Sequence, residues 1–220
     1  LYIRPLLIGL GKQVGIAPAN EYLFLVFVTP VGAYFKTGFR PSPMAIMRGY
    51  DRAAPLGTGT YKVGGNYAAS LKSGVLAHEL GYSAVIYLDA KEKLYIDECG
   101  PANFFGIREN TYITPKSSSI LPSVTNKSLM QLAQDMGLKV EQRPVHVDEL
   151  ATFEEAGACG TAAVISPILR VDDLDEHKQY IISKDGNPGP ISTALYERLR
   201  AIQYGDYPDE HGWVRLYESL

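Results

Sequence analysis

Short segments, separated by glycine and proline, limit what this chain can fold into more than any other feature of its sequence. Its 220 residues include 21 glycines and 14 prolines. In the first third, strand-like apolar runs at 2–10, 22–29 and 44–50 alternate with breaks rich in these two residues. From residue 66, apolar side chains such as Leu71 and Val75 recur at helical spacing, which predicts a helix over 66–80.

The remaining segments extend this mixture of strands and helices. Strands are expected at 84–88, 94–96, 103–108, 139–147 and 160–165. Thr125 is expected to cap a helix that Gly137 ends, Asp148 to cap a short helix over 148–156, and residues 191–202 to form the last helix. No internal repeat divides the sequence, which predicts one compact α+β domain with its candidate boundary near 40–43.

Composition argues against several classes of function. A net charge of -3 without a Lys/Arg cluster argues against nucleic-acid binding. No apolar run reaches the roughly 18–20 residues that span a bilayer. Cys99 and Cys159 lack the spacing of a disulfide framework or a zinc site, and the four histidines form no ligand cluster. The sequence therefore predicts a cytoplasmic protein without a metal site.

The most unusual stretch is APLGTGTYKVGGNY at 54–67, in which four glycines surround Lys62. Poor solvation there would favour the neutral amine, the form that attacks a carbonyl to make a Schiff base. Composition alone favours the alternative of a surface lysine in a glycine loop. A phosphate-binding loop is a weaker alternative, because neither G-x-x-x-x-G-K-[ST] nor G-x-G-x-x-G is complete.

The segment GTGTYKVGGNYAASL resembles the lysine motif of class IV (fold type IV) pyridoxal 5'-phosphate (PLP) enzymes, and of branched-chain aminotransferases in particular. Other family motifs occur in the family's order along nearly the whole chain: YIRP, VFVTPVGAYF, DECGPANFF, ILPSVT and CGTAAVISP. The resemblance implies the D-amino-acid aminotransferase-like α+β fold. It also implies that residues 1–40 end a small domain and supply pocket strands, while 41–220 form the large PLP-binding domain. Because the chain opens within a strand and without an initiator Met, most of the small N-terminal domain is expected to be missing.

The resemblance assigns three contacts to the cofactor's ring. Lys62 matches the lysine that binds PLP as a Schiff base, and Tyr67 matches the tyrosine that hydrogen-bonds the ring hydroxyl. Glu98 matches the glutamate beside the pyridine nitrogen, where a carboxylate keeps the ring protonated. From the residues alone, the adjacent Asp97 would serve equally well. Asn103 belongs to the same motif and is expected to support it.

Phosphate contacts are expected at the start of the second helix. Ser123, Val124 and Thr125 stand where backbone N–H groups converge, and Thr161 matches a second phosphate contact of the family. The family usually has glycine where this chain has Ser123, and arginine where it has Asn126.

The resemblance also implies an amino-acid pocket. Tyr2, Arg4 and Tyr34 match positions that line it, and the amides of Thr161 and Ala162 match those that hold the substrate carboxylate. Arg4 lies between apolar neighbours, where a charge buried alone would be costly, and this favours a functional role over an edge-strand arginine.

The implied activity is transfer of the amino group of leucine, isoleucine or valine to 2-oxoglutarate, as in branched-chain amino-acid biosynthesis, by a homodimer. Two alternatives share the fold: D-amino-acid transamination and lyase chemistry on aminodeoxychorismate. YIRP and the lysine motif argue against both. A third alternative, of another class, is a catalytically silent, truncated domain.

Overall fold

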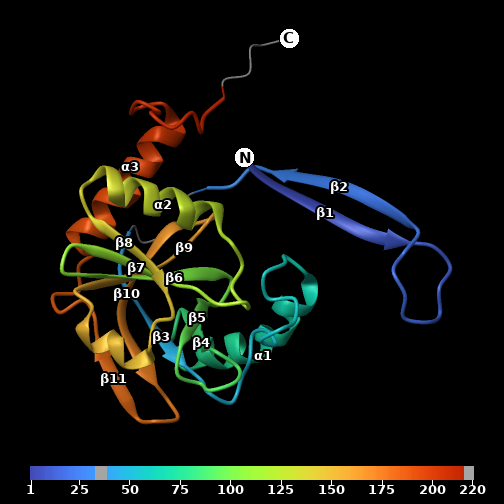
Figure 1. The fold of residues 1–220 in the computed structure, drawn as a ribbon, viewed down its shortest axis with the longest axis horizontal. Coiled ribbons are helices and arrows are strands. Elements are labelled where there is room, and N and C mark those ends of the chain that lie inside the picture. Colours follow the sequence, from blue (N-terminus) through green and yellow to red (C-terminus); the bar gives the residue numbers. More distant parts are fainter. Residues whose placement is uncertain (33–38, 216–220) are drawn as a thin grey trace. The chain divides into compact units, whose positions relative to one another are not determined.

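The structure, a computed structural model, describes residues 1–32 and 39–215. The chain falls into two compact units, residues 1–36 and 37–220. In the described residues every helix belongs to the second unit (Figure 1). None of these helices has the length and the apolar character that crossing a membrane requires.

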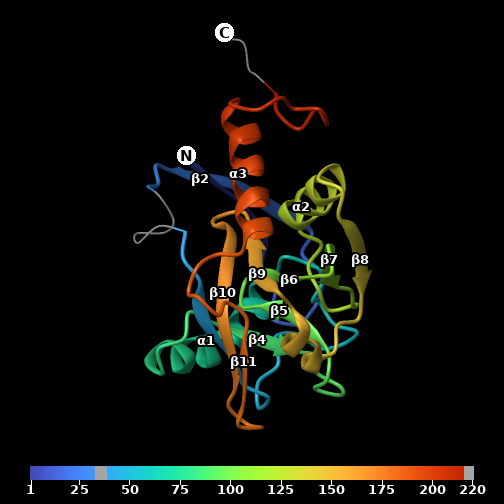
Figure 2. The same cartoon turned by 90° about the vertical axis from the view of Figure 1, so that its left-hand side faces the viewer.

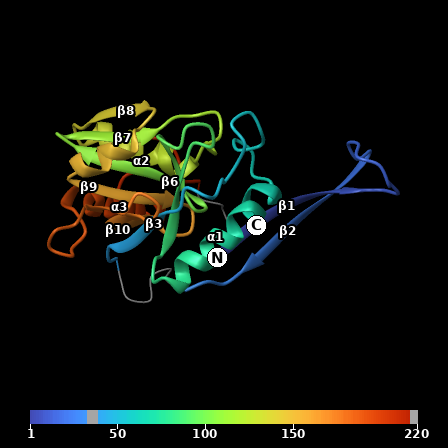
Figure 3. The same ribbon diagram turned by 90° about the horizontal axis from the view of Figure 1, so that it is seen from below.

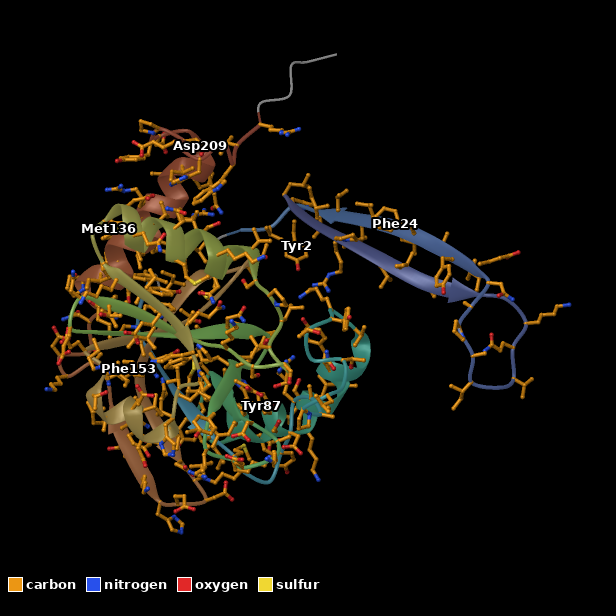
Figure 4. The ribbon with its side chains drawn as sticks, in the orientation of Figure 1. Tyr2, Phe24, Tyr87, Met136, Phe153 and Asp209 are labelled. Atoms are coloured by element: carbon orange, nitrogen blue, oxygen red, sulfur yellow. The ribbon has the colours of Figure 1, made fainter. Side chains whose placement is uncertain are left out.

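The first unit is an antiparallel hairpin of β1 (Tyr2–Leu10) and β2 (Glu21–Thr29), which confirms the two strands expected there. Successive side chains of a strand point to opposite faces. Leu6 and Leu7 are both exposed, as is Phe24, which Figure 4 labels, so both faces of the hairpin present apolar side chains.

The second unit is built on a mixed sheet of nine strands. In chain order they are β3 (Ser42–Ile46), β4 (Ala84–Leu88), β5 (Ile96–Cys99), β6 (Ala102–Arg108), β7 (Thr111–Pro115), β8 (Lys139–Arg143), β9 (Glu155–Gly160), β10 (Val164–Asp173) and β11 (Lys178–Ile181).

Pairing by β9 closes part of this sheet on itself. The order along the sheet is β11-β10-β3-β4-β5-β6-β7-β8, and β9 pairs antiparallel with both β10 and β6. The strands β10, β3, β4, β5, β6 and β9 therefore form a closed ring of hydrogen-bonded neighbours, a barrel-like core (Figure 2). Strand β11 extends the ring beside β10, and β7 and β8 extend it beside β6.

Alternating side chains of the ring strands fill its interior. Ile46, Ile86, Phe104, Ala158 and Ile168, which come from five strands, belong to one buried cluster. Because the members come from strands all round the ring, this cluster is the inside of the barrel.

Among the described residues, three α-helices cover the outside of the barrel. Helices α2 (Val124–Asp135) and α3 (Pro190–Tyr204) share a second buried cluster with β6, β9 and β10. Helix α1 (Gly64–Glu79) lies against β4, where the hydroxyls of Ser73 and Tyr87 are 2.6 Å apart. Figure 3 shows α1 well apart from α2 and α3, and Figure 4 labels Tyr87.

The helix expected over 66–80 is confirmed as α1, but its apolar stripe is not its buried face. Leu71 and Val75 are exposed, with 67% and 57% of their surface accessible, whereas Ser73 and Ala77 are fully buried. Small side chains let the helix approach β4 closely. The helix expected over 191–202 is also confirmed, as α3.

Several expected elements were wrong in extent. Strand β3 ends at Ile46, four residues before the end expected at residue 50. Strand β8 ends at Arg143, before Pro144, a residue that cannot donate to the ladder. The short helix expected over 148–156 is a 3-10 helix, Val147–Thr152, which His146 caps in place of Asp148. The strands β7 and β11 were not predicted. The strand expected over 94–96 shares only Ile96 with β5, and two strands, β9 and β10, stand where one was expected over 160–165.

Candidate active site

Lys62 lies in the loop that joins β3 to α1. Its Nζ donates a hydrogen bond of 2.7 Å to the Tyr67 hydroxyl and stands 5.1 Å from the centre of the Tyr67 ring. The expected poor solvation was wrong, because Lys62 is exposed. Glycines 57, 59, 64 and 65 carry no side chains that could cover the amine.

Asn66, a residue that sequence reasoning missed, fixes the shape of the lysine loop. Its buried side-chain amide donates to the carbonyls of Thr58 and Tyr61, and its carbonyl oxygen accepts from the Thr58 hydroxyl. An asparagine directly after two glycines, at the start of a helix, was the available signal. Three hydrogen bonds from one side chain hold the residues on the N-terminal side of Lys62.

Glu98 is buried on β5 and makes two defined contacts. Its Oε1 accepts a 2.6 Å hydrogen bond from the Leu121 amide, and its Oε2 lies 3.4 Å from Nε of Arg52. Burial raises the pKa of Glu98 to about 7, against the opposing charges of Arg52 and Lys62 and the Leu121 hydrogen bond. The influence of Lys62 shows that the amine and this carboxyl group interact electrostatically.

The neighbouring Asp97 has a different environment. Its two oxygens accept hydrogen bonds from the hydroxyls of Ser117, at 2.8 Å, and Ser119, at 2.5 Å. In contrast, Oε2 of Glu98 accepts no hydrogen bond from the described residues. The structure thus distinguishes the two carboxylates that the sequence left equivalent: among the described contacts, both oxygens of Asp97 accept a hydrogen bond, whereas only one oxygen of Glu98 does.

The raised pKa of Glu98 predicts a pH-dependent stability of the cofactor-free protein. Because the folded-state pKa of about 7 exceeds the ordinary 4.5, the stabilising contribution of Glu98 is present below pH 4.5 and is lost as the pH rises through 7. We expect the difference in free energy of unfolding, wild type minus Glu98→Gln, to fall by about 3 kcal/mol across this range. Urea unfolding at a series of pH values measures it, and a difference independent of pH would contradict the raised pKa.

Cross-strand pairing places the other predicted residues beside Glu98. Glu98 pairs with Asn103 of β6, and Asn103 pairs in turn with Cys159 of β9. The side-chain amide of Asn103 donates 3.0 Å to the carbonyl of Leu121, the residue whose N–H contacts Glu98. Glu98 and Asn103 together hold the chain just before α2.

Helix α2 begins one residue after Ser123, which is its N-cap in place of the expected Thr125. The Ser123 hydroxyl accepts a 3.1 Å hydrogen bond from the Asn126 amide, and the backbone of Ser123 is extended, with φ -84° and ψ 131°. The first N–H groups of a helix have no partner within it, and they carry a partial positive charge. The amides of Val124 and Thr125 therefore belong to an anion-binding end of the helix.

Replacing the cap should weaken this helix end. We expect Ser123→Ala to lower the free energy of unfolding by about 1 kcal/mol. The control is Ser128→Ala on the same helix, because the hydroxyl of the partly buried Ser128 hydrogen-bonds, among the described residues, only to the carbonyl of Val124. Urea unfolding that shows equal losses for both variants would argue against the cap.

Thr161 and Ala162 lie in the turn between β9 and β10, not in the strand expected over 160–165. Both residues are exposed, and the turn begins two residues after Cys159, the cross-strand partner of Asn103. A turn leaves backbone amides free of the sheet ladder, as binding through the amides of Thr161 and Ala162 requires.

Two of the expected substrate residues, Tyr2 and Arg4, contact each other on β1 of the first unit. Nη2 of Arg4 donates 3.0 Å to the hydroxyl of Tyr2, and the guanidinium stands 5.3 Å from the centre of the Tyr2 ring. Arg4 is exposed, so the argument from a buried charge does not hold here. Tyr34 lies outside the described residues. Among the described residues, no cluster of three or more histidine, cysteine or acidic side chains is arranged to hold a metal ion.

Comparison with known proteins identifies the family. Residues 1–171 match the family described as amino-transferase class IV. The chain belongs to this family. It is 51% identical over 217 residues to a branched-chain-amino-acid aminotransferase of Helicobacter pylori, a match that covers 97% of this chain and 62% of that protein. A branched-chain-amino-acid aminotransferase of Haemophilus influenzae is 48% identical over 221 residues, with 97% of this chain and 64% of that protein covered. The chain thus spans less than two thirds of these curated relatives.

Solved structures of the family share the fold. A branched-chain amino acid aminotransferase with pyridoxamine 5'-phosphate superposes with a TM-score of 0.84 at 28% identity, over 96% of this chain and 68% of that one. The branched-chain amino acid aminotransferase from Escherichia coli gives a TM-score of 0.75 at 26% identity, over 96% and 67%. These matches confirm the fold type IV architecture that the sequence motifs implied.

Proposed function

We propose that this protein is a PLP-dependent aminotransferase that moves the amino group of leucine, isoleucine or valine to 2-oxoglutarate, giving branched-chain 2-oxo acids and glutamate. The observation that carries the proposal is that Arg52 and Glu98 join three segments. Arg52 donates to the carbonyl of Gly59 in the lysine loop and to that of Ser119, and Glu98 accepts from Leu121, two residues before the α2 cap. The amine, the ring carboxylate and the phosphate end of a helix are thereby tied together.

The residues present fit this cofactor. A buried carboxylate with an oxygen that accepts no hydrogen bond from the described residues suits the N–H of a protonated pyridine ring. The N-terminus of α2 suits a phosphate, and the exposed Lys62 amine is accessible to an aldehyde. When bound, PLP supplies the aldehyde to which amines attach and the protonated ring that accepts electrons from the substrate.

Each side chain then has one task. Lys62 would hold the cofactor through its Nζ, and its amine would serve as the base that carries the proton away from the substrate Cα. Tyr67, whose hydroxyl accepts a hydrogen bond from Lys62 in this structure, would donate to the ring hydroxyl of the cofactor. Glu98 holds the proton at the ring nitrogen. The hydroxyl of Ser123, the amides of Val124 and Thr125, and Thr161 bind the phosphate.

Substrate recognition is proposed for the residues that match the family's pocket motifs. The amides of Thr161 and Ala162 bind the substrate carboxylate, and Tyr2, Arg4 and Tyr34 line the side-chain pocket. There the Arg4 guanidinium receives the second carboxylate of glutamate, because an arginine fork matches a carboxylate. The chain motifs and the names of the curated relatives support this choice of substrates.

The wider organisation is also proposed. Residues 1–40 end a small domain and supply pocket strands, while 41–220 form the large PLP-binding domain. The protein acts as a homodimer in the cytoplasm, and two buried free thiols, Cys99 and Cys159, suit that reducing compartment. Sedimentation of the active protein measures the assembly, and a fully active monomer would contradict the dimer.

The test of the function is an absorbance spectrum of the intact protein with PLP, before and after borohydride, followed by peptide mapping. We expect a visible band that borohydride removes, a pyridoxyl group on Lys62, and transfer from leucine to 2-oxoglutarate. Activity only with D-alanine or aminodeoxychorismate would favour the alternatives on the same fold. No band and no activity would leave a silent homologue.

A further inference from the structure

Arg52 lies in the loop that joins β3 to α1, ten residues before Lys62, and the family motifs named above do not include it. Only 8% of its surface is accessible. Its Nη2 donates to the carbonyl of Ser119 and, at 3.3 Å, to that of Gly59. Its Nε is buried and finds no hydrogen-bond partner among the described residues.

The charge of Arg52 is matched by Glu98. Carbonyl oxygens satisfy donors but do not neutralise a guanidinium, and a buried unpaired charge is costly. Nε lies 3.4 Å from Oε2 of Glu98, and both side chains are more than nine-tenths buried. Asp97 also feels the charge of Arg52, but its oxygens are already held by the hydroxyls of Ser117 and Ser119.

The two oxygens of Glu98 are therefore not equivalent. Oε1 is fixed by the amide of Leu121, while Oε2 faces the unpartnered Nε of Arg52. The backbone carbonyls of Gly59 and Ser119 hold the other end of the guanidinium in place. A charge fixed in this way acts on Oε2 over a short distance and in surroundings of low dielectric constant, where its effect is large.

We propose that Arg52 is a positioning residue, which keeps Glu98 ionised and its Oε2 directed to the ring nitrogen of the bound cofactor. The inference rests on the proposed function and deepens it. One proton is shared between Oε2 and the ring nitrogen. The positive charge of Arg52 lies nearer the carboxylate and favours the state in which the nitrogen carries that proton. Without Arg52, the proton moves to the carboxylate and the ring nitrogen becomes neutral.

The test compares four proteins loaded with PLP that carries nitrogen-15 in the ring: wild type, Arg52→Met, Glu98→Gln and the double variant. Arg52→Met should move the nitrogen-15 resonance toward that of unprotonated pyridine. It should also slow the single-turnover reaction with leucine by roughly 10- to 100-fold, the usual effect of losing a residue that orients a functional group. In the Glu98→Gln background the same replacement should change neither quantity, because Arg52 acts through Glu98.

Arg52→Lys is the conservative control, and it should restore the protonated nitrogen signal because it restores the charge. An unchanged resonance in Arg52→Met, or an equal slowing in both backgrounds, would overturn the proposal and leave Arg52 a structural residue of the loop. If Arg52→Met does not fold, the carbon-13 carboxyl shift of Glu98 in the wild-type holoenzyme decides: an ionised group supports the proposal, and a protonated one overturns it. Wild type that takes up no PLP at Lys62 would contradict the proposed function itself, a result visible before any variant is compared.

Discussion

Lys62→Ala is expected to abolish the covalent attachment of PLP and nearly all transamination. The variant loses the amine that attaches the cofactor and the base that moves the Cα proton, so kcat should fall by roughly 10⁴-fold. The fold should survive, because Lys62 is exposed and its hydrogen bond in the described structure goes only to Tyr67. Absorbance, borohydride trapping and leucine turnover measure the loss, and circular dichroism measures the fold.

The chain offers a matched control for this result. Lys72 is also exposed and lies ten residues further on, along α1. We expect Lys72→Ala to bind PLP and to turn over like the wild type. If both variants kept the visible band, the cofactor lysine would lie elsewhere and the assignment of Lys62 would be wrong.

Local motifs predicted the loop of Lys62, the helices α1, α2 and α3, and the strands β3, β4, β6 and β8 of the second unit. The glycines around Lys62 indicate a loop, and Gly137 indicates the end of a helix. Both signals can be read from a single sequence. The residue that caps α2 could not be predicted in this way, because Ser123 and Thr125 are both good N-cap residues. The extended backbone of Ser123 identifies it as the cap.

Closure of the barrel could not be predicted from such patterns. It depends on β9, which pairs with β6 and β10. Strand β9 carries small residues, Ala156 to Gly160, whose alternation between the two buried clusters gives no polar and apolar contrast to recognise. The turn that displays Thr161 was misread as strand for the same reason.

The burial of charged side chains was the second feature that could not be predicted from the sequence. The sequence shows that Asp97 and Glu98 are adjacent, but which of them keeps a free oxygen depends on Ser117 and Ser119, about twenty residues away. Arg52 likewise precedes Lys62 by ten residues and gives no sign that it is buried against Glu98. Both facts arise from long-range packing, which spacing along the chain does not encode.

Comparison of Glu98→Gln with Asp97→Asn tests which of the two carboxylates keeps the ring nitrogen of the cofactor protonated. Both replacements keep the size of the side chain and remove one carboxylate from adjacent buried positions. Glutamine cannot hold the ring nitrogen in its protonated form, so Glu98→Gln should slow the reaction with leucine by roughly 10²-fold, the scale of losing one preorganised electrostatic partner.

Asp97→Asn should act on stability instead. The introduced amide would have one oxygen for the hydroxyls of Ser117 and Ser119, which now donate to two, so the variant should lose about 1–3 kcal/mol of unfolding free energy. Its rate of reaction with leucine should change far less than that of Glu98→Gln. Stopped-flow absorbance gives the rates, and urea unfolding gives the stabilities. The reverse pattern, a slow Asp97→Asn and an unaffected Glu98→Gln, would show that Asp97 serves the ring nitrogen. In that case an oxygen of Asp97 would accept from the ring nitrogen in addition to a serine hydroxyl, since each carboxylate oxygen has two lone pairs.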